Sequence, residues 1–366
     1  MKAAEIISVL EDFAPLTYQE SYDNCGVQVG DTNIEVTGVL LTLDITEEVI
    51  DEAIARHCNM IVAHHPVIFS GLKKLTGRNY VERVVLKAIK NDILLYAAHT
   101  NMDNARAGVN AIIAERIGLQ QTTILQPMQG TLKKLYTYAP GKDAARVRDA
   151  LFAAGAGHIG KYAECSFNTE GHGSYRPLPD ATPYIGEAGG PRHTEPEVKI
   201  EVLVQPHNEA TVLRALFASH PYEEVAYELV ALQNQNQELG AGLVGNLPEP
   251  MDTTAFLTHL KEKMNVSCIR HTRLPVKKIQ RVAVCGGSGS FLLKDAIRAG
   301  ANLFITADYK YHQFFDAENR IVIADIGHYE SEQFTVQLFE QLLKKKIPNF
   351  APLLSDINTN PVNYFF

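Results

Sequence analysis

The stretch Asn59-Met60-Ile61-Val62-Ala63-His64-His65-Pro66 decides the fold of this chain. An apolar run of this length, ended by a proline, predicts a short buried strand. Two histidines follow the apolar residues, so both imidazoles are expected at the carboxyl end of that strand. Ligands of open α/β sheets bind outside the carboxyl ends of the strands. His64 and His65 are therefore candidates for a binding site, and the rest of the chain has to supply their partners.

Similar apolar runs alternate with helical patterns around this stretch. Buried strands are predicted at residues 36–43, 59–63 and 93–98, and helices at residues 46–56 and 80–90. Uninterrupted apolar strands that alternate with helices predict an α/β fold, with a parallel sheet covered on both faces. The pattern resumes after residue 240, with predicted strands at residues 281–285, 302–306 and 321–325 and a helix at residues 332–345.

The middle of the chain has a different order of predicted strands and helices. A strand, a helix and a strand are followed by a Gly/Pro-rich stretch at residues 171–196 and by a second strand, helix and strand. This order predicts a ferredoxin-like α+β domain. We therefore expect three parts: an α/β half at residues 1–128, an α+β insert at residues 129–235 and a second α/β half at residues 236–366.

Composition excludes several classes of protein. The chain has 366 residues, a net charge of −8 and no dense basic block, so binding of nucleic acid through a broad basic face is disfavoured. The five cysteines form no CxxC pair, which is typical of reduced thiols in a cytosolic protein. We recognise no signal peptide and no apolar run that could span a bilayer, and we expect a cytoplasmic protein without membrane partners.

The two α/β segments can be aligned as an internal repeat. The segments share the order strand, helix, strand, followed by a further strand, with polar residues just past equivalent strand ends. Two such halves facing each other would bring these ends into one cleft. In this register His65 aligns with Asp308. His328 falls one residue after the position of His99, and Glu332 falls one residue after that of Asp103.

Five residues form a candidate metal site: His64, His65, Asp103, His328 and Glu332. The spacing of His328 and Glu332 places both side chains on one face of a helix. Imidazole together with carboxylate suits zinc, iron or manganese, with zinc favoured here. Five ligands are too many for one open tetrahedral site. They fit two divalent ions roughly 3.5–4 Å apart that share a carboxylate, for which we choose Glu332, and a water.

Other polar residues are expected near the same strand ends. His99 and His312 are candidate catalytic residues that would carry protons, and Asp308 could do so or support a metal ligand. Each could instead hydrogen-bond the sheet. The run Gly286-Gly287-Ser288-Gly289-Ser290 follows a predicted strand, where backbone N–H groups can hold an anion. A tight turn explains this run equally well.

These motifs together resemble the signatures of the NIF3 family, also called GTP cyclohydrolase I type 2 homologues. The resemblance rests on His64-His65-Pro66, Thr100-Asn101-Met102-Asp103 and Gly327-His328-Tyr329-Glu330-Ser331-Glu332. It extends to residues 22–30 and to residues 306–312, where Ala307 replaces the usual glycine. The insert resembles the PII-like or CutA-like domain of the longer bacterial members. The resemblance implies a dinuclear metal site at the five ligands and a homo-oligomer, in the longer members a hexameric toroid with the sites facing an interior cavity.

We therefore predict a metal-dependent hydrolase in which a water bridging two ions attacks an electrophilic carbon or phosphorus. The family name suggests opening of the guanine ring of GTP, and phosphoester hydrolysis fits the same residues. The expected ligand is a nucleotide or another phosphorylated small molecule. The alternative is a non-enzymatic regulatory or interaction protein that responds to a metal or ligand, with the insert as its sensor.

Overall fold

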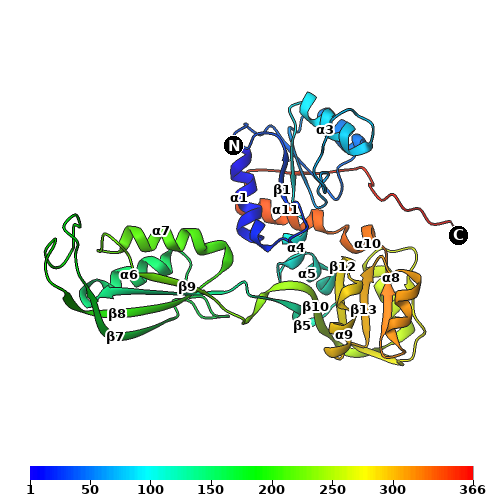
Figure 1. The fold of residues 1–366 in the computed structure, drawn as a ribbon. Coiled ribbons are helices and arrows are strands. Elements are labelled where there is room, and N and C mark those ends of the chain that lie inside the picture. The colour runs from blue at the N-terminus through cyan, green and yellow to red at the C-terminus, as the bar shows by residue number, and fades with distance from the viewer. Residues whose placement is uncertain (366) are drawn as a thin grey trace. The chain divides into compact units, whose positions relative to one another are not determined.

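The computed structural model describes residues 1–365 and divides into two compact units. Unit 1 consists of Met1–Pro127 together with the segment from Glu238 onward, and unit 2 is Met128–Gln237. Unit 1 contains two sheets with helices packed on them, whereas unit 2 contains one sheet with two helices (Figure 1). The predicted α/β class is therefore confirmed. No helix among the described residues is long and apolar enough to cross a membrane.

The first sheet of unit 1 has the strand order β1-β4-β3-β2-β15. Strands β2, β3, β4 and β15 run parallel, and β1 pairs antiparallel with β4 at the edge. The strand predicted at residues 59–63 is β3, and all four of its residues are buried. The bounds are β1 Gly26–Val29, β2 Val39–Thr42, β3 Met60–Ala63, β4 Leu94–Ala97 and β15 Leu353–Leu354.

Helices cover both faces of this sheet, which explains why its strands are apolar without alternation. Met60 and Val62 on β3 belong to a core shared with α1 and α11, while Ile61 and Ala63 face the core shared with α2 and α3. Thr46 caps α2, because its side chain accepts a hydrogen bond from the Val49 N–H. The helices are α1 Ala3–Phe13, α2 Glu47–Ala55, α3 Tyr80–Lys90, α4 Thr100–Asn104, α5 Val109–Arg116 and α11 Thr335–Lys346.

The second sheet of unit 1 has the order β11-β14-β13-β12-β10-β5. Its three central strands β12, β13 and β14 run parallel. Strand β5 was not predicted. The strand bounds are β5 Gln120–Gln129, β10 Gln235–Asp252, β11 Arg270–His271, β12 Lys278–Ser288, β13 Leu303–Ala307 and β14 Val322–Asp325. The remaining α-helices of unit 1 are α8 Thr253–Lys263, α9 Leu293–Arg298 and α10 His328–Glu332. Its 3-10 helices are η1 Leu16–Tyr18, η3 Ser290–Leu292 and η4 Tyr311–Ala317.

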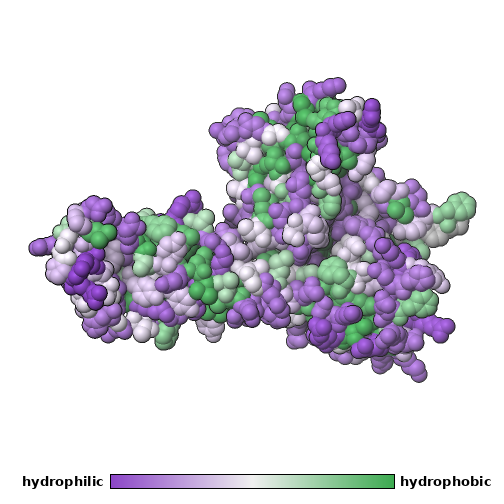
Figure 2. Space-filling model, viewed as in Figure 1, coloured by the Kyte–Doolittle hydropathy of each residue, from purple (hydrophilic) through white to green (hydrophobic). Residues whose placement is uncertain are grey.

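Unit 2 has the element order βαββαβ, and its strands form an antiparallel sheet in the order β7-β8-β6-β9. Its own core includes the buried Leu135, Val147 and Leu216. Strands β7 and β8 extend into the Gly/Pro-rich stretch at residues 171–196, because Ser166–Tyr175 of β7 pairs with β8 as a long antiparallel ribbon. The bounds are β6 Lys133–Pro140, α6 Gly141–Ala153, β7 Ser166–Tyr175, β8 His193–Val204, η2 Pro206–Asn208, α7 Glu209–Ser219 and β9 Tyr227–Ala231. Figure 2 shows hydrophilic residues over the visible face of each unit, with smaller hydrophobic groups between them.

Candidate metal centre

The candidate ligands lie just past the carboxyl ends of parallel strands in both sheets of unit 1. His64 and His65 follow β3, and Asp103 lies on α4, which begins three residues after β4. His328 and Glu332 lie on α10, which follows β14 after a two-residue turn. The position of ligand sites in open α/β sheets is thus reproduced at both sheets. The five residues that the sequence singled out are brought together.

His64 points an unpaired nitrogen at a carboxylate. Its Nδ1 lies 2.8 Å from the Ala98 carbonyl oxygen and donates to it, which leaves Nε2 with its lone pair directed inward. Nε2 of His64 and Oδ1 of Asp103 lie 3.6 Å apart. Both atoms are buried without a hydrogen-bond partner among the described residues. Buried polar atoms are rarely left unpaired, and an imidazole nitrogen beside a carboxylate oxygen is a donor pair that fits a metal ion.

His65 and His328 hold Glu332 from two sides. Nε2 of His65 lies 3.0 Å from Oε2 of Glu332, and Nε2 of His328 lies 3.1 Å from the same oxygen. The outer nitrogens are also bound: Nδ1 of His65 lies 2.7 Å from Asp44, and Nδ1 of His328 lies 2.7 Å from Asp308. Metal-bound histidines usually donate their second N–H to a carboxylate or carbonyl, which fixes the ring and the tautomer. All three candidate imidazoles have this arrangement.

The potential ligand atoms form overlapping groups that share residues. One group is His65, His328 and Glu332, and a second is His64, Asp103 and Glu332, each with its ligand atoms within 4.8 Å of one another. Glu332 belongs to both groups. A third group joins His64 and His65 to His99.

Burial and the charges of neighbouring groups shift the pKa values of the candidate ligands. Burial and the neighbouring Glu332 raise the pKa of Asp103 to about 7. Burial alone would raise the pKa of Glu332, but His328, His64 and His65 hold that pKa well below its usual range. Burial would lower the pKa of His65, but its hydrogen bonds to Asp44 and Glu332 outweigh burial and raise it to about 10. The donor set of imidazole nitrogens and carboxylate oxygens fits zinc, iron or manganese.

His99 belongs to the same site and is held by a buried aspartate. Its Nδ1 lies 2.9 Å from Oδ1 of Asp23, and its ring centroid lies 5.2 Å from that of His64. The second oxygen of Asp23 accepts hydrogen bonds from the backbone N–H and the hydroxyl of Thr100. Burial opposes ionisation of Asp23, but the hydrogen bonds from His99 and Thr100 keep its pKa well below the usual value of 3.8. A permanent carboxylate thus orients the His99 ring.

The glycine run begins in the last three residues of β12 and packs against Glu332. The Gly286 N–H donates to Asn110, and the Gly287 N–H donates to the hydroxyl of Ser331, so these two groups are already occupied. A Cβ on Gly287 would lie 2.3 Å from Oε1 of Glu332, at a φ of +62°. These glycines lie where the pairing of β12 with β13 shifts register, and they let the Glu332 carboxylate approach the backbone.

A cavity of about 520 Å³ opens beside His65, His99 and His328. The C-terminal segment forms part of its wall. Thr359 donates a hydrogen bond to Asp44, and the side-chain amide of Asn360 donates to Glu330. The end of the chain is thereby fastened to a residue that orients a candidate ligand.

Asp23 and Asp44 were not predicted as site residues from the sequence. Asp44 follows β2 at the same sheet edge as His64, and this position was the signal that could have identified it. Asp23 lies in the segment whose resemblance to the family was noted without a role for the residue. His312 is exposed on η4, where its ring neighbours are Tyr311 and Phe315, and it is not among the residues that line the cavity. The proton-carrying role of His312 stays a prediction from the sequence.

Comparisons with known proteins identify the family of this chain. The family model of Duf34/NIF3 (NGG1p interacting factor 3) matches residues 1–361. A Bacillus subtilis protein named GTP cyclohydrolase 1 type 2 homolog is 38% identical over 98% of both chains, and a Staphylococcus epidermidis protein of the same name is 34% identical over the full length of both. The crystal structure of a Bacillus cereus protein related to NIF3 has 37% identity and a TM-score of 0.85, covering 100% of this chain and 99% of that one. This chain therefore belongs to the Duf34/NIF3 family.

Proposed function

We propose that this protein binds two divalent metal ions at His64, His65, Asp103, His328 and Glu332. The observation that carries the proposal is the unpaired, buried pair of His64 Nε2 and Asp103 Oδ1 beside a second set that shares Glu332. One ion would be held by His64, Asp103 and Glu332, and the other by His65, His328 and Glu332. Zinc is the favoured metal, with iron and manganese as alternatives.

We further propose that the protein, with these metal ions bound, is a hydrolase. Ions at this site would act as Lewis acids and make water a better nucleophile near neutral pH. The chain's own contribution is to orient the ligands through Asp44, Asp308 and the Ala98 carbonyl, and to move protons through His99. Because Asp23 accepts the Nδ1 proton of His99, Nε2 is the nitrogen that can exchange a proton with a substrate.

The cavity supports a nucleotide or another phosphorylated small molecule as the substrate. Phe69 and Tyr329 give it flat apolar walls, and the Arg270 guanidinium lines it as the basic group. Arg270 forms an ion pair with Asp325 at 3.2 Å, and about half of its side chain is exposed, so it remains able to contact an anion. The name of the relatives suggests guanine ring opening in GTP, and phosphoester hydrolysis is chemically compatible with the same groups.

Metal content and turnover test the proposal separately. The gently purified full chain is expected to contain, or take up on reconstitution, two ions per chain by elemental analysis. Fewer than about one ion, with no uptake, refutes the site. Metal-loaded protein and its His65→Ala variant are then assayed with GTP and a panel of phosphoesters. The exposed His158→Ala in unit 2 is the matched control. Turnover that disappears with chelation and with His65→Ala supports the hydrolase, and turnover no greater than that of the variant refutes it.

A non-enzymatic role is the second candidate. It is favoured by the separate cavity of about 640 Å³ in unit 2, a feature that a hydrolase active site in unit 1 does not require. In this case the protein would respond to a metal or ligand, with unit 2 as the sensor. Stoichiometric metal binding without turnover on any substrate is the result that favours this role.

Two further proposals concern organisation. The halves of unit 1 would be repeats, because in each the candidate site residues follow the second and third of three neighbouring parallel strands. The chain would also form a homo-oligomer, a hexamer by the family resemblance. Light scattering of the full chain measures this directly, and a monomer at micromolar concentration contradicts it.

A further inference from the structure

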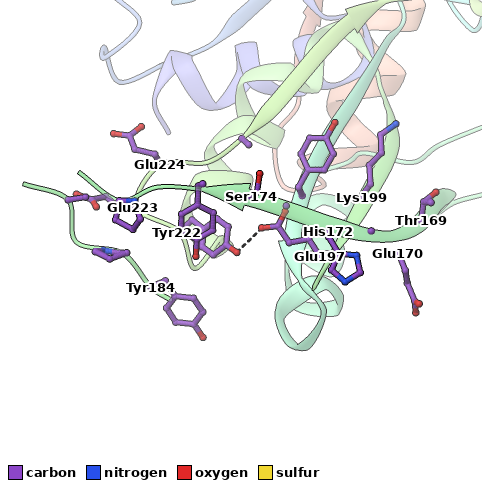
Figure 3. Close-up of a pocket in the computed structure, with 18 residues that line it drawn as sticks. Thr169, Glu170, His172, Ser174, Tyr184, Glu197, Lys199, Tyr222, Glu223 and Glu224 are labelled. Atoms are coloured by element: carbon purple, nitrogen blue, oxygen red, sulfur yellow. Dashed lines mark hydrogen bonds between the residues drawn. The ribbon is translucent and has the colours of Figure 1, made fainter. Parts of the chain in front are cut away.

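Unit 2 contains a cavity of about 640 Å³ that the metal site does not explain. Strands β6, β7 and β8 form part of its wall, together with the segment after β7 and the turn that precedes β9. Figure 3 shows Tyr222 near the centre of this cavity, with Glu197 beside it and Tyr184 at the edge. Every residue of the wall belongs to unit 2, so the site can be considered within that unit alone.

Three tyrosines form a corner of aromatic rings in this cavity. The ring centroid of Tyr222 lies 5.9 Å from that of Tyr175 and 6.3 Å from that of Tyr184. The interplanar angles are 63° and 55°, so the rings are inclined to one another and do not stack flat. Inclined rings can direct several negatively polarised faces at one bound group, which is how aromatic cages hold organic cations. The chain already uses one of these rings in this way, since the Lys142 ammonium lies 4.7 Å from the centroid of Tyr184.

A carboxylate lies beside the central ring. Oε1 of Glu197 accepts a 2.7 Å hydrogen bond from the Tyr222 hydroxyl, drawn as a dashed line in Figure 3. Its other oxygen lies over Gly173, where a Cβ would be only 2.1 Å away. The glycine thus leaves the space that the carboxylate occupies. Burial and the neighbouring Glu197 raise the pKa of Tyr222, which indicates that the surroundings of this ring are negative.

The charge of the cavity wall favours a cation. Four glutamates line it, namely Glu170, Glu197, Glu223 and Glu224. The lysine that lines it, Lys199, is engaged elsewhere: its ammonium lies 3.0 Å from Glu201 and over the ring of Tyr136, and in Figure 3 it points away from Tyr222.

An inorganic cation does not fit this wall. Across the described residues, the groups of His, Cys, Asp and Glu close enough to hold a metal ion all lie in unit 1. The cavity therefore combines negative charge and aromatic faces without a compact set of metal ligands. An ammonium or guanidinium group with apolar substituents satisfies both features, because its charge pairs with the carboxylate and its carbon-bound hydrogens face the rings.

We propose that unit 2 binds a small organic cation in a cage formed by Tyr175, Tyr184 and Tyr222, with Glu197 as the counter-charge. The site is independent of the metal centre and of the proposed hydrolase activity. Quaternary ammonium, primary amine and guanidinium compounds share the required chemistry, and the test distinguishes among them.

Titration calorimetry on the full chain tests the proposal. The probes are choline, cadaverine and agmatine, with 3,3-dimethylbutan-1-ol as the uncharged analogue of choline. At least one cation is expected to bind saturably with a millimolar or lower Kd, and the neutral alcohol at least tenfold more weakly. Tyr222→Ala is expected to weaken binding roughly 2- to 30-fold, the range of a lost cation–π contact. Glu197→Gln is expected to weaken it by a similar factor, and Tyr222→Phe less than Tyr222→Ala because the ring is kept.

Controls in the same unit separate the cage from general effects. Tyr162→Ala and Glu164→Gln change an exposed tyrosine and an exposed glutamate outside the cavity, and both are expected to bind as the unmodified chain does. Circular dichroism establishes that each variant is folded, and Glu197→Gln serves if Tyr222→Ala is not. The proposal is overturned if none of the three cations binds, if the neutral alcohol binds as tightly as choline, or if folded Glu197→Gln binds as tightly as the unmodified chain.

Discussion

Nε2 of His65 and Oε2 of Glu332 lie 3.0 Å apart although 267 positions separate them in the chain. The two residues follow strands of different sheets, so their contact joins the two halves of unit 1 at the candidate metal centre. Glu332 also contacts His328 and lies within reach of His64. Removing its charge should therefore affect both proposed ions at once.

Glu332→Gln keeps the shape of the side chain but removes the shared negative charge. We expect the loss of both ions per chain on gel filtration, and an affinity reduced by more than the roughly 10- to 100-fold typical of changes to an outer hydrogen-bond partner. Elemental analysis measures the result. Glu340→Gln, at a partly exposed residue of α11 that pairs with Lys344, is the control and should keep both ions. Retention of two ions by Glu332→Gln would contradict its bridging position.

Asp44→Asn and Asp308→Asn change the groups that orient His65 and His328 without touching the ligand set. Each should lower metal affinity by about 10- to 100-fold while the number of sites stays the same. Competition with a chromophoric chelator gives the affinities. The exposed Asp51, which pairs with Lys87, provides the control Asp51→Asn. Unchanged affinities in both orienting variants would mean that these hydrogen bonds do not position the ligands.

Gly287→Ala and Gly300→Ala form a matched pair. Both glycines have a positive φ, of +62° and +73°, so both substitutions carry the same backbone strain of about 1–2 kcal/mol. Only the Cβ at position 287 meets Glu332, at 2.3 Å, whereas nothing lies within 4 Å of a Cβ at position 300. We expect a larger loss in the free energy of unfolding for Gly287→Ala than for Gly300→Ala, because the buried Glu332 must move, and a loss of metal affinity for Gly287→Ala alone. Equal metal affinities would show that Glu332 moves aside without consequence.

Asp23→Asn tests the stabilisation by the buried carboxylate that holds His99. The pKa of Asp23 is lowered on folding from its usual 3.8, so its ionised form stabilises the fold above about pH 4, and this contribution is lost as the pH falls through the lowered value. The variant should be less stable than the unmodified chain by about 1–3 kcal/mol at pH 7, with a smaller difference below pH 4. Urea unfolding at several pH values measures it, with the exposed Asp12→Asn as control. A difference that does not depend on pH would refute the linkage.

The local pattern of apolar and polar residues was sufficient to predict much of the fold. The uninterrupted apolar runs at residues 59–63 and 93–98 predict strands that are buried on both faces, and every residue of β3 and β4 is buried. The spacing of His328 and Glu332 likewise required one helical face, and α10 provides it. The extent of β7 and β8 was not predictable from their glycine- and proline-rich sequence, because the pairing of the two strands, more than local propensity, forms that ribbon.

The sequence by itself determined which residues could carry metal-binding chemistry, because it places imidazoles and carboxylates just past the ends of buried strands. Only the tertiary structure decided how they are combined. Asp44, Asp308 and Asp23 orient histidines that lie 20 to 76 positions away in the chain, and no local periodicity records such contacts. The same holds for Glu332, whose place between His65 and His328 depends on how two separate sheets pack. Periodicity reports the burial of each element against its neighbours, whereas the position of a side chain between elements depends on the packing of the whole unit.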